Sequence, residues 1–141
     1  MNAALALLTG NETEADMERI QAAMLAWLTD DATGPPLHQR LGLSRRSARC
    51  ELRNTHLRAA AALLAGDPWP RAEQLAESCR AFEARRWPRW RLNGPPPGAA
   101  LIDLELGQAR QFGEITLTQR QLFNIIATEA NTCRDFGTDG R

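Results

Sequence analysis

Three observations in the sequence predict an all-α protein, a bundle of about five to seven helices. Apolar residues recur at spacings of three and four along several segments, which gathers them on one side of a helix. Residues that favour helix N-caps, such as Thr13, Ser44 and Thr118, stand directly before these segments. Glycine and proline clusters separate the segments, most strongly NGPPPG at residues 93–98.

Length and composition match one globular domain. The chain has 141 residues, of which 43% are hydrophobic and 24% are charged. We expect a single helical domain over residues 1–130, with halves at 1–66 and 67–130, followed by a disordered polar tail at 131–141. No apolar run approaches the roughly eighteen residues of a membrane-spanning helix, and the first residues lack a signal-peptide pattern. We therefore expect a cytoplasmic protein that does not interact with membranes.

Cysteine and arginine usage bear on the redox state of the chain and on its coding bias. Cys50, Cys79 and Cys133 lie far apart and lack the CxxC spacing of metal sites, so we expect reduced thiols, no disulfide framework and no zinc. All seventeen basic residues are arginine, and the chain contains no lysine, valine or tyrosine. A GC-rich bacterial, phage or mobile-element coding bias explains this composition.

The N-terminal half is expected to begin with a capped helix. Thr13, or Asn11 before it, can act as N-cap, and an acidic residue three positions on can complete a capping box. A helical stripe follows and ends near Asp30, and residues 1–8 could add a short apolar helix. Pro36 suits a first helical position and opens a helix of under two turns at residues 37–41. The stripe consists of Met17, Ile20, Met24, Trp27 and Leu28.

A long helix is expected from Arg45 to Gly66, with Ser44 as its N-cap. Its second half is apolar and should bury Leu57, Leu63 and Leu64. Its first half is basic, because residues spaced by four, four and three positions form one stripe with Arg46 beside it. That stripe consists of Arg45, Arg49, Arg53 and His56.

Charge is segregated along the chain although the total is zero. Residues 1–34 hold six acidic residues against one arginine, a net charge of −5, whereas residues 37–58 hold six arginines against Glu51, a net charge of +5. Such blocks can attract an external polyanion, or they can attract each other. The basic helix face could therefore bind DNA or pair with the acidic first helix.

The C-terminal half contains three further helical patterns. Residues 67–70, DPWP, predict an extended corner, because two prolines disfavour helix there. An amphipathic helix should run from Pro70 to Arg86 and end before Pro88. A second amphipathic helix is expected at residues 99–112. Thr118 with Gln121, and Leu117 with Leu122, form a capping box and a hydrophobic staple for the last helix.

Two tryptophans lie among arginines at residues 85–91, RRWPRWR. Trp87, Arg89 and Trp90 are candidate partner-binding residues, because basic and aromatic side chains can stack on bases or grip phosphate. The alternative is that the two indoles close the core and that arginines stack on their outer faces.

The segment from Leu37 to Leu57 resembles the helix-turn-helix of bacterial and phage DNA-binding proteins. RLGLSRR supplies Leu41, Gly42, Leu43 and Ser44 in the expected order, and Leu37 stands four residues before Leu41. Three features depart from the pattern: His38 replaces a small residue, two prolines shorten the first helix, and Glu51 replaces an apolar residue. The resemblance implies that Arg45, Arg46 and Arg49 face the major groove and that Arg53 contacts a phosphate.

No catalytic, cofactor-binding or metal-binding pattern is present, so we expect a non-enzymatic protein. His38 and His56 are the only histidines, and neither phosphate-cradling glycine loops nor a Gly-x-Ser-x-Gly turn occurs. We expect a small DNA-binding or regulatory protein that works as a homodimer. The alternative is a phage-type inhibitor or adaptor that binds a protein partner.

Overall fold

The computed structural model describes residues 2–30 and 34–127, and the expected disordered tail lies outside them. The prediction of an all-α fold is confirmed, and the described part of the chain forms eight helices, one more than the upper limit expected. The helices are α1 (Ala3–Leu8), α2 (Glu14–Thr29), α3 (Leu37–Arg40), α4 (Arg45–Ala62), α5 (Pro68–Arg85), α6 (Trp87–Asn93), α7 (Leu101–Phe112) and α8 (Gln119–Ala127).

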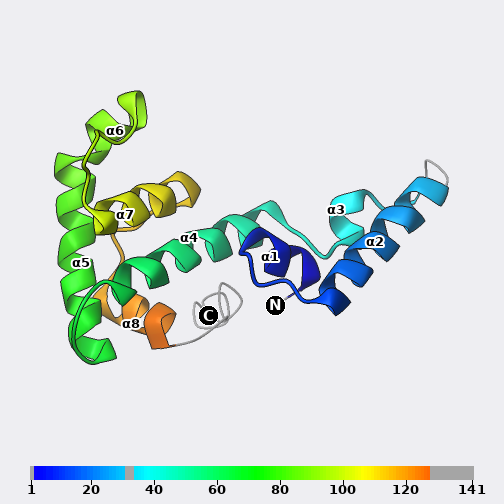
Figure 1. Cartoon of the computed structure of the whole chain (residues 1–141), viewed down its shortest axis with the longest axis horizontal. Helices are drawn as coiled ribbons and strands as arrows, with labels where there is room; N and C mark the ends of the chain where they lie inside the picture. The colour runs from blue at the N-terminus through cyan, green and yellow to red at the C-terminus, as the bar shows by residue number, and fades with distance from the viewer. Residues whose placement is uncertain (1, 31–33, 128–141) are drawn as a thin grey trace.

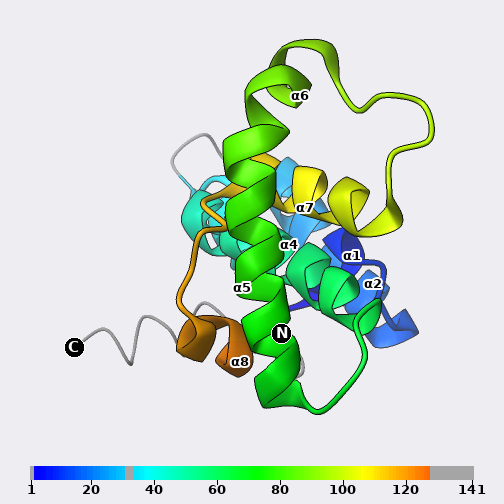
Figure 2. The ribbon, with the colours of Figure 1, turned by 90° about the vertical axis from the view of Figure 1, so that its left-hand side faces the viewer.

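A single apolar core joins the two halves of the sequence. It is built by the C-terminal part of α4 together with α5, α7 and α8. Figures 1 and 2 show α5 lying across the end of α4, with α7 and α8 on the same side of it. The largest side chains without solvent exposure are Phe82, Leu57, Leu75, Leu106, Ile115 and Leu122.

Helices α1, α2 and α3 form an arm, in which α1 lies beside α4 and α2 and α3 extend beyond the N-terminal end of α4, away from this core (Figure 1). Helix α2 packs on α1 and α3, and α1 in turn packs on α4. The capping box predicted for α2 is confirmed, because Thr13 and Asp16 exchange hydrogen bonds of 3.0 and 3.2 Å. The apolar stripe of α2 is not buried as a whole, since Ile20 is its only buried residue.

Two expectations about proline were wrong. Helix α5 starts at Pro68 rather than Pro70, with Asp67 as N-cap, and residues 87–93 form the additional helix α6 instead of a helix end. Both helices place a proline in the first two positions, where the missing N–H has no helical partner to lose. Helix α4 is shorter than expected, because it ends at Ala62 and leaves Leu63 49% exposed.

The start of α8 follows the sequence prediction. The amide of Gln121 donates to Thr118 Oγ1 at 3.1 Å, and the amide of Thr118 donates to Gln121 Oε1 at 2.9 Å. Leu122 is buried and Leu117 packs against the core, as a hydrophobic staple requires.

Thr118→Ala should destabilise the protein by about 1 kcal/mol, because an orphan amide of α8 loses its acceptor. Chemical denaturation would measure the change in the free energy of unfolding. Thr116→Ala is the matched control, since Thr116 is exposed and lies outside the helix, where its hydroxyl donates to Glu114 Oε1 at 2.8 Å. Its effect should stay within about 0.5 kcal/mol. Equal effects of the two substitutions would contradict the capping role.

The thiol of Cys79 gives a second prediction. Burial raises the pKa of Cys79 to about 12, so the folded protein keeps a proton that the unfolded chain loses from about pH 9 upwards. The free energy of unfolding should therefore fall between about pH 9 and pH 12, by up to about 1.4 kcal/mol per pH unit. Lysine and tyrosine, which titrate in the same range, are absent from the chain.

Denaturant titrations at about pH 8 and about pH 10.5 would detect this loss. Cys79→Ala removes the thiol, so its stability should change much less over the same interval. A decline of equal size in the variant would assign the alkaline effect to another group.

Candidate nucleic-acid interface

The candidate interface is the N-terminal end of α4. Ser44 caps the helix by accepting a hydrogen bond of 3.1 Å from the amide of Ser47. The preceding turn contains Gly42 with φ of +69°, a left-handed conformation that glycine adopts without steric cost. Arg45 and Arg46 follow in the first turn of the helix, and both are exposed. The expected start of the basic helix is therefore confirmed.

All four arginines of the candidate site line one open depression. Its volume is about 660 Å³, and its other lining residues are Cys50 and Phe112. Phe112, the last residue of α7, is a member of this surface that sequence reasoning missed. No local pattern could reveal it, because the contact depends on how α7 packs on α4. The arginines are Arg45, Arg46, Arg49 and Arg53.

Arg49 is held by the last turn of α7, and Arg53 is held by the loop that follows it. Arg49 Nη2 donates to the carbonyl oxygen of Gln111 at 3.0 Å, and Arg53 Nη1 donates to that of Glu114 at 3.2 Å. The final carbonyl groups of a helix lack helical partners and carry partial negative charge, so guanidinium groups stabilise them. These two side chains therefore attach α7 to α4 as well as adding positive charge to the depression.

The guanidinium of Arg53 is also partly withdrawn from water. Burial lowers the pKa of Arg53 from its ordinary value, and the charge of Glu114 acts in the opposite direction. Its Nε and Nη2 atoms donate to Asn54 Oδ1 at 3.1 and 2.9 Å. Asn54 is fully buried, so this contact fixes where the guanidinium lies.

The acidic residues of α2 do not neutralise this site through the ion pairs that the structure shows. Asp16 pairs with Arg19 in its own helix, at 3.8 Å, and Asp30 pairs with Arg40 of α3. Figure 1 shows α2 extending away from α4. The two charged blocks therefore meet at Arg40, whereas the four arginines around the depression form none of these ion pairs with α2.

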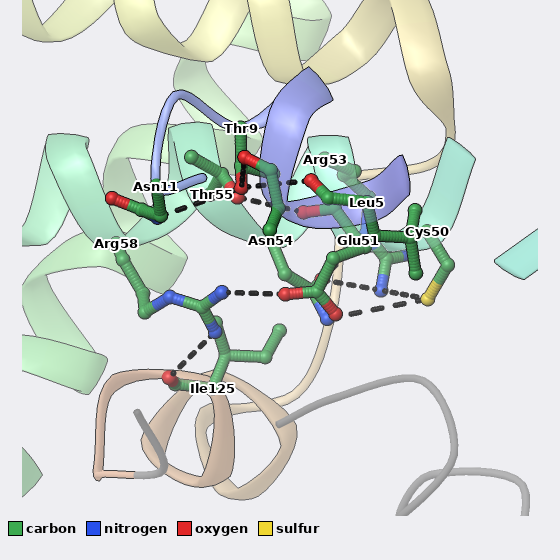
Figure 3. A network of polar contacts seen from close by, with 11 residues as sticks. Leu5, Thr9, Asn11, Cys50, Glu51, Arg53, Asn54, Thr55, Arg58 and Ile125 are labelled. Atoms are coloured by element: carbon green, nitrogen blue, oxygen red, sulfur yellow. Dashed lines mark hydrogen bonds and ion pairs between the residues drawn. The ribbon is translucent and has the colours of Figure 1, made fainter. Parts of the chain in front are cut away.

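Glu51, which departs from the helix-turn-helix pattern, is buried and paired. Only 4% of its surface is exposed, and Arg58 Nη2 donates to its Oε1 at 2.9 Å. Arg58 also reaches the carbonyl oxygen of Ile125 in α8 at 3.5 Å, as Figure 3 shows. The carboxylate therefore takes part in joining α4 to α8, which explains why this position is not apolar.

His56, the last member of the stripe, faces α7. Its Nδ1 lies 3.0 Å from Glu105 Oε2, and its ring stacks on Phe112 with centroids 6.2 Å apart. His56 thus contributes to helix packing. The contacts of Arg49 and His56 show that α4 and α7 run antiparallel, because higher residue numbers in one helix meet lower numbers in the other.

The two tryptophans of the candidate partner site lie against the core. The ring of Trp90 meets that of Phe82 edge-on at 5.1 Å, and Trp87 lies 6.3 Å from Phe82. The guanidinium of Arg110 stacks 5.1 Å from the Trp87 ring. Arg89 is exposed on α6. Both indoles nevertheless line a small pocket of about 200 Å³ between α6 and α7, so an outer face of each is accessible.

Cys50 and Cys79 differ in oxidation state. Cys79 is free and buried, as expected, whereas Cys50 is disulfide-bonded. The expectation of reduced thiols was therefore wrong at Cys50, where its position on α4 gave no hint of a bond. Cys133 lies outside the described residues.

Within residues 2–30 and 34–127, no group of three or more His, Cys, Asp or Glu side chains is arranged to hold a metal ion. None of the helices in these ranges combines the length and the hydropathy needed to cross a bilayer.

Comparisons of the chain with protein-family profiles, with curated proteins and with solved structures gave no match.

Arg58→Met should destabilise the protein by about 3 kcal/mol, because it leaves the buried carboxylate of Glu51 without its cation. Chemical denaturation measures the loss. Arg80→Met is the control, since Arg80 is exposed on α5, and its effect should remain below about 0.5 kcal/mol. Adding Glu51→Gln to Arg58→Met should recover part of the stability. No recovery in the double variant would mean that Arg58 acts through packing rather than charge.

Proposed function

We propose that the protein is a non-enzymatic DNA-binding protein that contacts the phosphate backbone through the depression at the start of α4. The observation that supports this proposal is the gathering of Arg45, Arg46, Arg49 and Arg53 around one open surface. The acidic residues of α2 form their ion pairs elsewhere. A polyanion therefore meets an accessible group of positive charges.

The placement of Arg45 and Arg46 supports a ligand of negative charge. Both lie in the first turn of α4, which contains no acidic residue. The N-terminal end of a helix carries partial positive charge, so each cation there costs about 0.3–1 kcal/mol. A bound phosphate would offset this cost and would also accept hydrogen bonds from the guanidinium groups. An arrangement that reduces stability without a ligand is typical of a binding surface.

The four arginines would not share one role. Arg49 and Arg53 already donate to carbonyl groups of α7 and the loop after it, so we assign them mainly an electrostatic contribution. Arg45 and Arg46 have exposed guanidinium groups, and we assign them the phosphate contacts. Phosphate contacts carry no direct sequence information. Binding should therefore be sensitive to salt and weakly dependent on DNA sequence.

The test is a titration of duplex DNA at several salt concentrations. The wild-type protein should bind at about 50 mM salt and release DNA steeply as salt rises, because each neutralised phosphate frees counterions. Arg45→Ala with Arg46→Ala should weaken binding and reduce the slope of log K against log salt by about 2. Arg80→Ala, at an exposed site on α5, should change neither quantity. Absence of binding at about 50 mM salt would rule out this function.

A second candidate is an inhibitor or adaptor that binds a protein partner. The pocket between α6 and α7 favours it, because Trp87 and Trp90 offer aromatic surface there and Arg91 lies beside them. Tryptophan and arginine are enriched among the residues that dominate protein–protein binding energy. A protein that fails to bind duplex DNA at low salt would make this candidate the leading one.

A further inference from the structure

Phe112 is an aromatic residue that lies apart from the apolar core. Within the described residues, neither the buried core nor the hydrophobic side chains packed against it include Phe112. Its ring is half-buried and lines the depression at the start of α4. By contrast, Phe82 is fully buried and Phe123 packs against the core. Core packing therefore does not explain why an aromatic residue stands at position 112.

Two arginines hold the backbone on either side of Phe112. Arg49 Nη2 donates to the carbonyl oxygen of Gln111 at 3.0 Å. Arg53 Nη1 donates to the carbonyl oxygen of Glu114 at 3.2 Å. The segment that carries the ring is therefore fixed to α4 by the same side chains that give the depression its positive charge.

The ring of Phe112 is also held in orientation. It lies parallel to the ring of His56 to within 5°, with centroids 6.2 Å apart. His56 is in turn held from α7, because its Nδ1 lies 3.0 Å from Glu105 Oε2. A side chain that is already fixed loses little conformational entropy when a ligand packs on it. Phe112 is therefore a preorganised aromatic surface.

The chemistry around this ring fits a nucleic acid strand. No residue that lines the depression is acidic, and its volume of about 660 Å³ has room for a nucleotide. Proteins that bind single strands combine a positively charged groove with aromatic side chains on which bases stack. In a duplex the neighbouring base pairs cover the base faces, so a ring at this place can stack only on an unpaired or terminal base. The charged lining residues are Arg45, Arg46, Arg49 and Arg53.

We propose that Phe112 stacks on an unpaired base of a nucleic acid strand whose phosphates are bound by the arginines of the depression. This proposal rests on the proposed function, because the same arginines supply the phosphate contacts, and it adds a preference for strands with unpaired bases. Every base has a π-face, so the stacking does not depend on sequence. Phe112 thus supplies a contact that phosphate binding alone does not need.

The two tryptophans beside α7 are less suited to this role. Trp87 and Trp90 line a pocket of about 200 Å³, and Arg91 is the one charged side chain among the described residues that line it. Both indoles also lie against Phe82 of the core. The depression at α4, in contrast, places an aromatic ring beside several cations that can bind successive phosphates.

Two single strands with the same phosphates separate stacking from charge. One is an oligothymidylate of about 12 nucleotides, and the other is an abasic strand of equal length. The full chain is used without reductant, so that the disulfide of Cys50 is kept. At about 50 mM salt it should bind the oligothymidylate roughly 5- to 150-fold more tightly than the abasic strand. Equal affinities for the two strands overturn the proposal.

The ratio of these two affinities also tests Phe112 itself. Phe112→Leu keeps an apolar side chain but removes the ring, so the ratio should fall to about 1. Phe112→Tyr keeps the ring and should keep the wild-type ratio. Trp27→Leu is the matched control, because Trp27 is an exposed aromatic residue of α2 that does not line the depression. A general loss of structure weakens binding of both strands, so an unchanged ratio in Phe112→Leu overturns the role of the ring.

A photo-crosslink in the wild-type protein checks the contact without any substitution. An oligothymidylate that carries iodouracil reacts on illumination with an aromatic side chain stacked on it. Mass spectrometry should locate the attachment at Phe112. Attachment at Trp87, at Trp90 or at any other residue instead overturns the proposal.

Relaxed circular duplex DNA, which has no ends, separates this proposal from the proposed function. Binding of the circle together with equal affinities for the two single strands overturns the stacking role and leaves duplex binding in place. A preference for the oligothymidylate without binding of the circle supports the stacking role and rules out duplex binding. Absence of binding to all three nucleic acids overturns both.

Discussion

The antiparallel packing of α7 on α4 is the interaction on which the rest of the structure depends. The C-terminal part of α4 supplies Leu57 to the core, and its N-terminal part reaches the end of α7 through Arg49 and Arg53. One helix therefore combines two kinds of contact, apolar burial and hydrogen bonds to carbonyl groups of α7 and of the loop after it. Without α7 in place, Arg49 would lose its carbonyl acceptor and Arg53 would keep its contacts within α4.

Buried polar groups of α4 fix the register in which the helices pack. Glu51 and Asn54 are buried on α4, and each is satisfied by an arginine of the same helix. Arg58 extends from Glu51 to the backbone of α8. A carboxylate in an apolar interior is costly unless it is paired, so α8 and α4 must meet in the arrangement that supplies the pair. Apolar contacts alone would tolerate several registers.

The two charged blocks of the chain lie mostly on separate surfaces. Four arginines of the basic block line the depression at the start of α4, and the acidic block lies on the arm, where Asp30 pairs with Arg40 of the basic block. This arrangement leaves a positive surface around the depression that a polyanion can reach.

The sequence by itself determined the elements whose signals are local. The caps at Thr13, Ser44 and Thr118 were predicted correctly, because a cap depends on residues within one turn. The amphipathic stripe of α5 likewise matched its buried face, which includes Ala72, Leu75 and Phe82. The prolines misled the prediction, because the same residue breaks a helix interior and begins a new helix.

Only the tertiary structure decided which faces are covered. The stripes of α2 and α5 look alike in sequence, yet α5 is buried by α4, α7 and α8 while most of the α2 stripe remains exposed. The arginine stripe was visible in the sequence, but its attachment to α7 joins residues 62 positions apart. Periodicity shows that a face exists. Whether solvent, a neighbouring helix or a ligand meets that face depends on long-range packing, which local residue patterns do not encode.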